Sequence, residues 1–160
     1  MSLDAFDYFE RLDARVGSDH LFKRSLLLVK AWCRYEKDAV GGAREGGLAT
    51  HAINAMVAEI FRDFGAYVKH PLDVFAHFVE RYGESGTTTT SGSSLPRCAR
   101  VVDPLDASRN CARALSSSKA SAFALSLARI RNDVRSVVTF EPCSGGGDAS
   151  GGSGRNRKKK

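Results

Sequence analysis

The sequence predicts a mainly α-helical fold, a helical bundle with at most a minor strand element. Apolar residues recur at intervals of three and four over most of the chain, which is the period of an amphipathic helix. Strand-like runs are few: residues 99–102 form the best candidate, and residues 137–140 a weaker one. The length of 160 residues fits one domain with a substantial core.

The first two expected helices are amphipathic. Residues 2–16 place apolar side chains on one face: Leu3, Phe6, Phe9, Leu12 and Val16. A second helix is expected over about residues 18–37, with Ser18 or Asp19 as its N-cap, because a short oxygen-bearing side chain can accept from the first free amides. Its apolar face comprises Phe22, Ser25, Leu26, Leu28, Val29, Trp32 and Cys33. The opposite side carries a basic stripe, which consists of Lys23, Lys30, Arg34 and Lys37.

A glycine-rich segment, residues 41–47, leads into the third expected helix. This helix begins near residues 47–50 and has a strong core-facing pattern: Ile53, Met56, Val57, Ile60, Phe61 and Phe64. Pro71 suits a first helical turn and opens a fourth helix that reaches Tyr82. Apolar spacing predicts a further helical region over residues 112–134.

The predicted domain organisation is simple. Residues 1–136 form a helical domain with a flexible Gly/Ser/Thr loop at 83–95, and residues 137–160 form a disordered Gly/Ser-rich tail with a basic C-terminus. The formal net charge is +6, but five positive charges lie in residues 155–160, so the rest of the chain is near neutral. The basic end favours a nuclear location or a nonspecific nucleic-acid contact, and a plain solvated tail explains it equally well.

The cysteines and the hydropathy indicate an intracellular protein, either nuclear or cytoplasmic. The four cysteines lie far apart, with no C-x-x-C pair and no histidine at zinc spacing, so no disulfide framework or metal site is expected. The apolar run at residues 26–29 is too short to cross a membrane, so no membrane partner is expected.

The basic stripe and the start of the third helix together indicate a polyphosphate site. A helix start offers free amides and the positive end of the helix dipole, both of which suit an anion. A row of cations is ordinarily just the solvated face of a helix. Here, however, no acidic residue lies four positions after these cations, apart from Asp38 after Arg34.

Four blocks of the sequence, taken in order, resemble a known family. They are DHLFKRSLLLVKAWCRYE, GGLATHAINAMVAEIF, HPLDVFAHFVERY and RVVDPLDASRNCARAL. They are similar to the substrate-binding domain shared by poly(A) polymerases, terminal uridylyltransferases and oligoadenylate synthetases, and most of all to its plant and algal branch. The resemblance covers about residues 12–131 except for a middle segment, and it implies a helical bundle of that type.

The resemblance implies roles for particular residues. Lys30 and Arg34 match the basic positions that hold the NTP triphosphate, and Thr50 matches a hydroxyl that touches phosphate. His51 matches an aromatic residue that stacks on the base. Ala49 departs from the family pattern because it lacks a hydroxyl, and the ring of His51 offers less area than a tyrosine.

The resemblance also implies a base and RNA side of the cleft. Arg109, Asn110 and Arg113 match positions in the family's motif there. Residues 83–95 replace what is in the family an ordered, aromatic-rich piece, so we expect an eroded nucleotide site.

Catalysis in this family needs paired carboxylates that hold two Mg²⁺ ions in a separate catalytic domain. Glu36 and Asp38 have a similar spacing but lie at the end of a helix, and Asp103 and Asp106 flank a proline turn. We therefore expect no metal to be bound by this chain, and Mg²⁺ to act only with a missing catalytic domain.

The sequence thus predicts the NTP- and RNA-binding half of a template-independent RNA nucleotidyltransferase of the poly(A) polymerase type, inactive alone. Whether the chain is an enzyme in its own right stays open. The expected partners are an NTP, an RNA 3′ end and a separate catalytic palm domain. Two alternatives remain: a non-catalytic, degenerate relative that binds RNA or a protein, and a scaffolding bundle whose basic stripe is only solvated.

Overall fold

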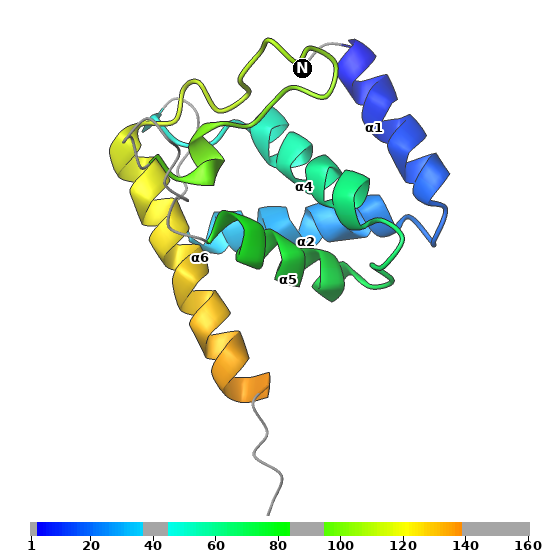
Figure 1. Cartoon of the computed structure of the whole chain (residues 1–160). Helices are drawn as coiled ribbons and strands as arrows, with labels where there is room; N and C mark the ends of the chain where they lie inside the picture. The colour runs from blue at the N-terminus through cyan, green and yellow to red at the C-terminus, as the bar shows by residue number, and fades with distance from the viewer. Residues whose placement is uncertain (1–2, 37–44, 84–94, 139–160) are drawn as a thin grey trace, which may run out of the picture.

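The computed structural model describes residues 3–36, 45–83 and 95–138, which form a helical bundle (Figure 1). Five α-helices and one short 3₁₀ helix make up the described part: α1 Leu3–Val16, α2 Leu21–Tyr35, α4 Thr50–Phe64, α5 Pro71–Tyr82, η2 Arg97–Ala99 and α6 Ser117–Val138. The prediction of a mainly α fold is confirmed. The minor strand element reduces to one isolated bridge between Val102 and Asn110 in the described part. Residues 137 and 138, part of the weaker strand candidate, are helical.

Helix α4 lies at the centre of the bundle. Nine of its fifteen residues are buried, and the run of residues 52–58 is buried without a break, so more than one face is covered. Helix α4 packs against both α2 and α5, and the buried residues beside its predicted apolar face include alanines at positions 52, 55 and 58, which leave room for close packing. The periodicity thus predicted the main buried face, and the small residues explain the rest.

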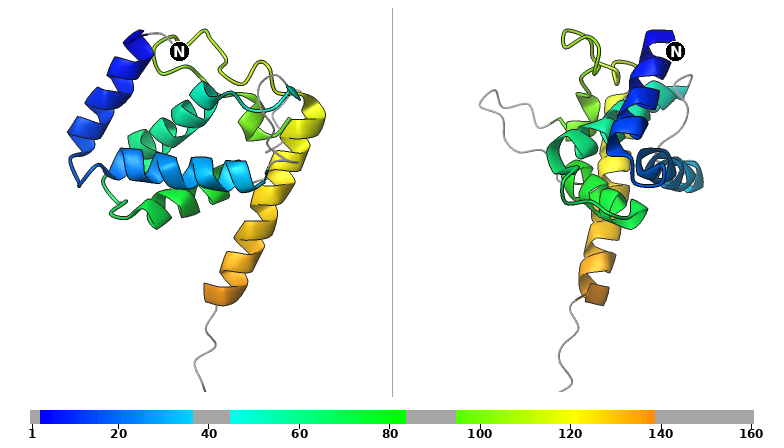
Figure 2. Two further views of the ribbon diagram at one scale, coloured as in Figure 1. Left: turned by 180° about the vertical axis from the view of Figure 1, so that it is seen from behind. Right: turned by 90° about the vertical axis from the view of Figure 1, so that its right-hand side faces the viewer.

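Helix α2 runs antiparallel to α4 (Figures 1 and 2). The rings of Phe22, near the start of α2, and Phe61, near the end of α4, meet at 5.5 Å between centroids. Farther along α2, Trp32 packs against Phe123 of α6 at 5.6 Å. The second half of α2 therefore lies toward the start of α4, where the sequence places the anion site.

The start of α2 differs from the prediction. Neither Ser18 nor Asp19 caps it, because the chain turns through positive φ at Asp19 (50°) and His20 (55°), and the helix begins at Leu21. The cap comes instead from the neighbouring helix: the buried Asp13 of α1 accepts a hydrogen bond from the backbone amide of Lys23 (3.2 Å). This bond ties α1 to α2.

The last two helices begin and end as follows. Pro71 opens α5 as predicted, and the Asp73 carboxylate accepts from the His70 amide (2.9 Å). Helix α6 packs on α5 and η2, projects beyond the rest (Figure 2) and continues to Val138, past the expected boundary at residue 136.

Residues 84–94 and 139–160, most of the expected loop and tail, lie outside the described residues. No helix within the described ranges is both long and apolar enough to span a bilayer.

Candidate functional site

The structure divides the basic stripe into paired and unpaired cations. Lys23 Nζ lies 2.8 Å from Glu10 Oε2 and 3.6 Å from Asp13 Oδ2, both on α1. Lys30 is half-buried, and desolvation lowers its pKa. Within the described residues neither Lys30 nor the exposed Arg34 has an ion-pair partner. Sequence spacing missed the pairing of Lys23 because its partners lie on another helix.

The start of α4 leaves backbone donors without a partner in the helix. Ala49 is the N-cap and makes no side-chain hydrogen bond, and the first helical bond runs from the Ile53 amide to the Ala49 carbonyl (3.2 Å). The amides of residues 50–52 therefore have no acceptor inside the helix. Thr50 is exposed at this end. The second half of α2, which carries Lys30 and Arg34, lies toward the start of α4, because the two helices are antiparallel.

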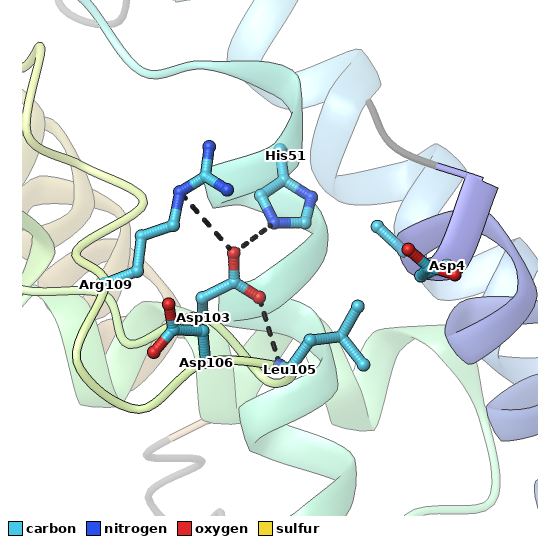
Figure 3. A pocket seen from close by; sticks show the side chains of 7 residues that line it. Asp4, His51, Asp103, Leu105, Asp106 and Arg109 are labelled. Atoms are coloured by element: carbon cyan, nitrogen blue, oxygen red, sulfur yellow. Dashed lines mark hydrogen bonds and ion pairs between the residues drawn. The ribbon is translucent and has the colours of Figure 1, made fainter.

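His51 is held on two sides. Its Nε2 lies 3.1 Å from Oδ2 of Asp103 (Figure 3), and its ring meets the ring of Phe9 edge-on at 5.9 Å. The Nδ1 atom is buried and has no hydrogen-bond partner. The side chain keeps 21% of its surface exposed, so one part of the ring remains open to a ligand.

Asp103 is a buried carboxylate at the centre of this site, with 5% of its side chain exposed. Oδ1 accepts from the Leu105 amide (3.0 Å), and Oδ2 faces both His51 and Nε of Arg109, the latter at 3.9 Å. Desolvation acts to raise the pKa of Asp103, but the bonds from the Leu105 amide and His51 outweigh it and lower the pKa. Fifty-two positions separate His51 from Asp103, so spacing gave no signal for this pair.

Asn110 holds the turn that carries Asp103. Its Oδ1 accepts from the amides of Val101 (3.0 Å) and Ala112 (2.9 Å), and its Nδ2 donates to the Ala99 carbonyl (2.9 Å). Both the Oδ1 atom and the Nδ2 atom of Asn110 therefore make hydrogen bonds within the protein. Arg113, in contrast, is exposed.

A cavity of about 390 Å³ opens between the starts of α1 and α4 and the turn at 103–109 (Figure 3). Its lining consists of Asp4, Ala5, His51, Asp103, Leu105, Asp106 and Arg109. Its volume lies in the range of small-molecule sites. Of the predicted site residues the cavity brings together His51 and Arg109, while Lys30, Arg34, Thr50, Asn110 and Arg113 are not part of its lining.

Comparison with known proteins gives one match. Residues 16–95, half of the chain, match the sequence model of the family described as the PAP/OAS1 substrate-binding domain. The matched region includes the basic stripe and the start of α4, whereas the turn at 101–111 lies beyond it. The match is to the family as a whole, so the plant and algal branch stays a prediction. No curated protein and no solved structure gives a significant match.

Proposed function

Because the chain belongs to the PAP/OAS1 substrate-binding domain family, we propose that it is the NTP- and RNA-binding half of a template-independent RNA nucleotidyltransferase. The family makes it a substrate-binding module of the nucleotidyltransferase type. We infer the nature of its substrates from the cations of α2 and the free amides at the start of α4. The observation that carries the proposal is the half-buried ammonium group of Lys30, which has no ion-pair partner among the described residues.

Lys30 supports triphosphate binding because no carboxylate compensates its charge in the part of the chain that the structure describes. Moving a cation partly out of water costs free energy unless a nearby anion offsets that cost. Here burial lowers the pKa of Lys30. Lys23 on the same stripe is already compensated by Glu10 and Asp13. A polyphosphate beside Lys30 would supply the missing negative charge, and the exposed guanidinium of Arg34, four residues on, adds a second positive charge.

The start of α4 supplies the other half of the phosphate site. The free amides of residues 50–52 and the positive end of the helix dipole suit an anion, and the Thr50 hydroxyl is exposed beside them. The amides and this hydroxyl take over the contact that Ala49 cannot make. We assign Lys30, Arg34 and Thr50 to the triphosphate.

The cavity beside α4 is the place for the base. His51 presents the open part of its ring there, and Arg109 lines the same cavity from the opposite turn. Stacking on one base is worth roughly 1–3 kcal/mol, less for an imidazole than for a larger ring. Asn110 and Arg113 belong to the RNA side of this cleft, Asn110 by shaping the turn.

The acidic residues of the cavity do not fit the Mg²⁺ ions of nucleotidyl transfer. Asp103 is engaged by His51 and the Leu105 amide, and Asp106 accepts from both the amide (3.0 Å) and the hydroxyl (2.6 Å) of Ser108. At Asp103 the neighbouring donor is an imidazole nitrogen, whereas Mg²⁺ prefers a shell of oxygen atoms. We therefore assign the metal chemistry to a separate catalytic domain and derive no catalytic step from this chain.

Titration of ATP and UTP, with Mg²⁺ present, into the purified chain tests the proposal. We expect saturable binding in the millimolar range, about −4 kcal/mol, because only half of the nucleotide site is present. Lys30→Ala should abolish it. Lys23→Ala is the matched control from the same stripe, and it should leave nucleotide affinity unchanged because Lys23 already has carboxylate partners.

Deletion of residues 155–160 distinguishes the alternatives. Binding that survives Lys30→Ala but disappears with this deletion would indicate a degenerate module that contacts RNA through its tail. If neither change affects binding, or if no nucleotide binds, the triphosphate assignment is wrong and the bundle is a scaffold.

A further inference from the structure

Three side chains with nitrogen, oxygen and sulfur donors converge next to the cavity: His51, Asp103 and Cys111. One donor atom from each lies within 4.8 Å of the other two, and the pair His51 Nε2 and Asp103 Oδ2 is 3.1 Å apart. Asp103 is buried, while His51 and Cys111 are partly exposed. The three residues lie far apart in the sequence and lack the short spacings that are typical of zinc sites. The sequence therefore gave no sign of them.

The turn at 101–111 positions two of these donors. Two backbone hydrogen bonds join its limbs: the Asp103 amide donates to the Arg109 carbonyl (2.9 Å), and the Cys111 amide donates to the Val101 carbonyl (2.7 Å). The side chain of Asn110 bridges the limbs as well. Asp103 and Cys111 therefore lie diagonally from each other on the two limbs of a closed turn, and the first turn of α4 brings His51 close to both. Donors held in this way by backbone bonds are preorganised for a ligand.

We propose that His51, Asp103 and Cys111 bind a Zn²⁺ ion that fastens the turn at 101–111 to the start of α4. Zinc takes imidazole, carboxylate and thiolate ligands at about 2.0–2.3 Å in a tetrahedron, which places neighbouring donors roughly 3.3–3.7 Å apart. The His51–Asp103 distance is already close to this value, and the sulfur of Cys111 lies within 4.8 Å of both donor atoms. On ligation the Cys111 thiol releases its proton to solvent.

The donor set selects the metal. Magnesium and calcium prefer shells made of oxygen alone, whereas a thiolate with an imidazole favours zinc among the abundant cations. Three protein ligands leave a fourth position, which a water molecule or a group entering the cavity can occupy. The site needs no nucleotide, so its test stands apart from that of the proposed function.

Cobalt is the probe for this site, because Co²⁺ replaces Zn²⁺ in tetrahedral sites and is coloured. We expect one equivalent of Co²⁺ to bind the full chain with intense tetrahedral d–d bands and a thiolate-to-cobalt charge-transfer band. Zn²⁺ should displace it. Cys111→Ser should remove the charge-transfer band and weaken the affinity by more than about tenfold, the lower end of the loss seen when even an outer-shell partner is removed.

A control and a second variant make the test decisive. Asp106→Asn should leave the spectrum unchanged, since Asp106 lines the cavity but is not in the donor set. His51→Gln, at a partly exposed position, should weaken Co²⁺ binding even if Cys111→Ser fails to fold. Absence of a charge-transfer band in the parent chain, or its survival in both ligand variants, would overturn the proposal.

Discussion

At the residue scale, Asp103 combines burial with several polar neighbours. It faces His51, the Leu105 amide and Arg109, and the bonds from His51 and the Leu105 amide favour its ionised form. Lys23 and Lys30 show the same dependence on surroundings. They are equivalent in the sequence pattern, yet Lys23 is paired across helices, whereas Lys30 has no ion pair within the described ranges. What a charged residue does here is therefore set by contacts from other elements.

The lowered pKa of Asp103 predicts an acid-dependent contribution to stability. Its folded pKa lies below the ordinary value of 3.8, so this contribution is complete above that pH and disappears as the pH falls through the folded pKa. Asp103→Asn should therefore lower the free energy of unfolding at neutral pH, and its difference from the parent chain should shrink below pH 3.8. Urea denaturation in EDTA at several pH values measures this.

Asp4→Asn is the matched control for that series. Asp4 lines the same cavity but is exposed. Its effect on the free energy of unfolding should stay within about 0.5 kcal/mol at neutral pH. A difference for Asp103→Asn that does not change with pH would contradict the assigned role of its charge.

At the element scale, α1 is tied to the start of α2 by Asp13. The carboxylate is buried and accepts from the Lys23 amide, and the ring of His20 lies 2.7 Å away. Asp13→Ala should lower the free energy of unfolding by about 1–3 kcal/mol, because it leaves a helix-start amide without its acceptor. Asp7→Ala on the same helix removes only an exposed pair with Arg11 and should cost less than about 1 kcal/mol. Equal losses would show that Asp13 does not cap α2.

The junction of α5 with α6 depends on the absence of a side chain at Gly83. A Cβ there would lie 3.0 Å from Cβ of Leu127 and 3.1 Å from the backbone nitrogen of Ala128. Gly65, at the end of α4, provides the comparison, because the three atoms nearest to its Cβ would all belong to Phe61 in its own helix. Gly83→Ala should therefore reduce the melting temperature more than Gly65→Ala, with an additional cost of about 1 kcal/mol or more. A smaller loss of melting temperature for Gly83→Ala than for Gly65→Ala would contradict this account and would mean that α6 shifts to accommodate the added methyl group.

At the scale of the whole molecule, the helices were predictable because each carries its own apolar period. The positions of Ile53 and Ile60 predict a buried face on α4 from local spacing alone. The start of α2 was not predictable, since its cap comes from α1 rather than from Ser18 or Asp19. The contacts of His51 escaped prediction for the same reason: they join segments that only the folded chain brings together.

The central claim is that this module binds a triphosphate between α2 and the start of α4. Two-dimensional ¹H–¹⁵N NMR of the ¹⁵N-labelled chain during titration with UTP and Mg²⁺ tests it most directly. The account predicts saturable shifts at the amides of residues 50–52 and around Lys30, all lost in the Lys30→Ala/Arg34→Ala variant. Shifts confined to residues 155–160, or shifts that persist in this variant, would contradict it.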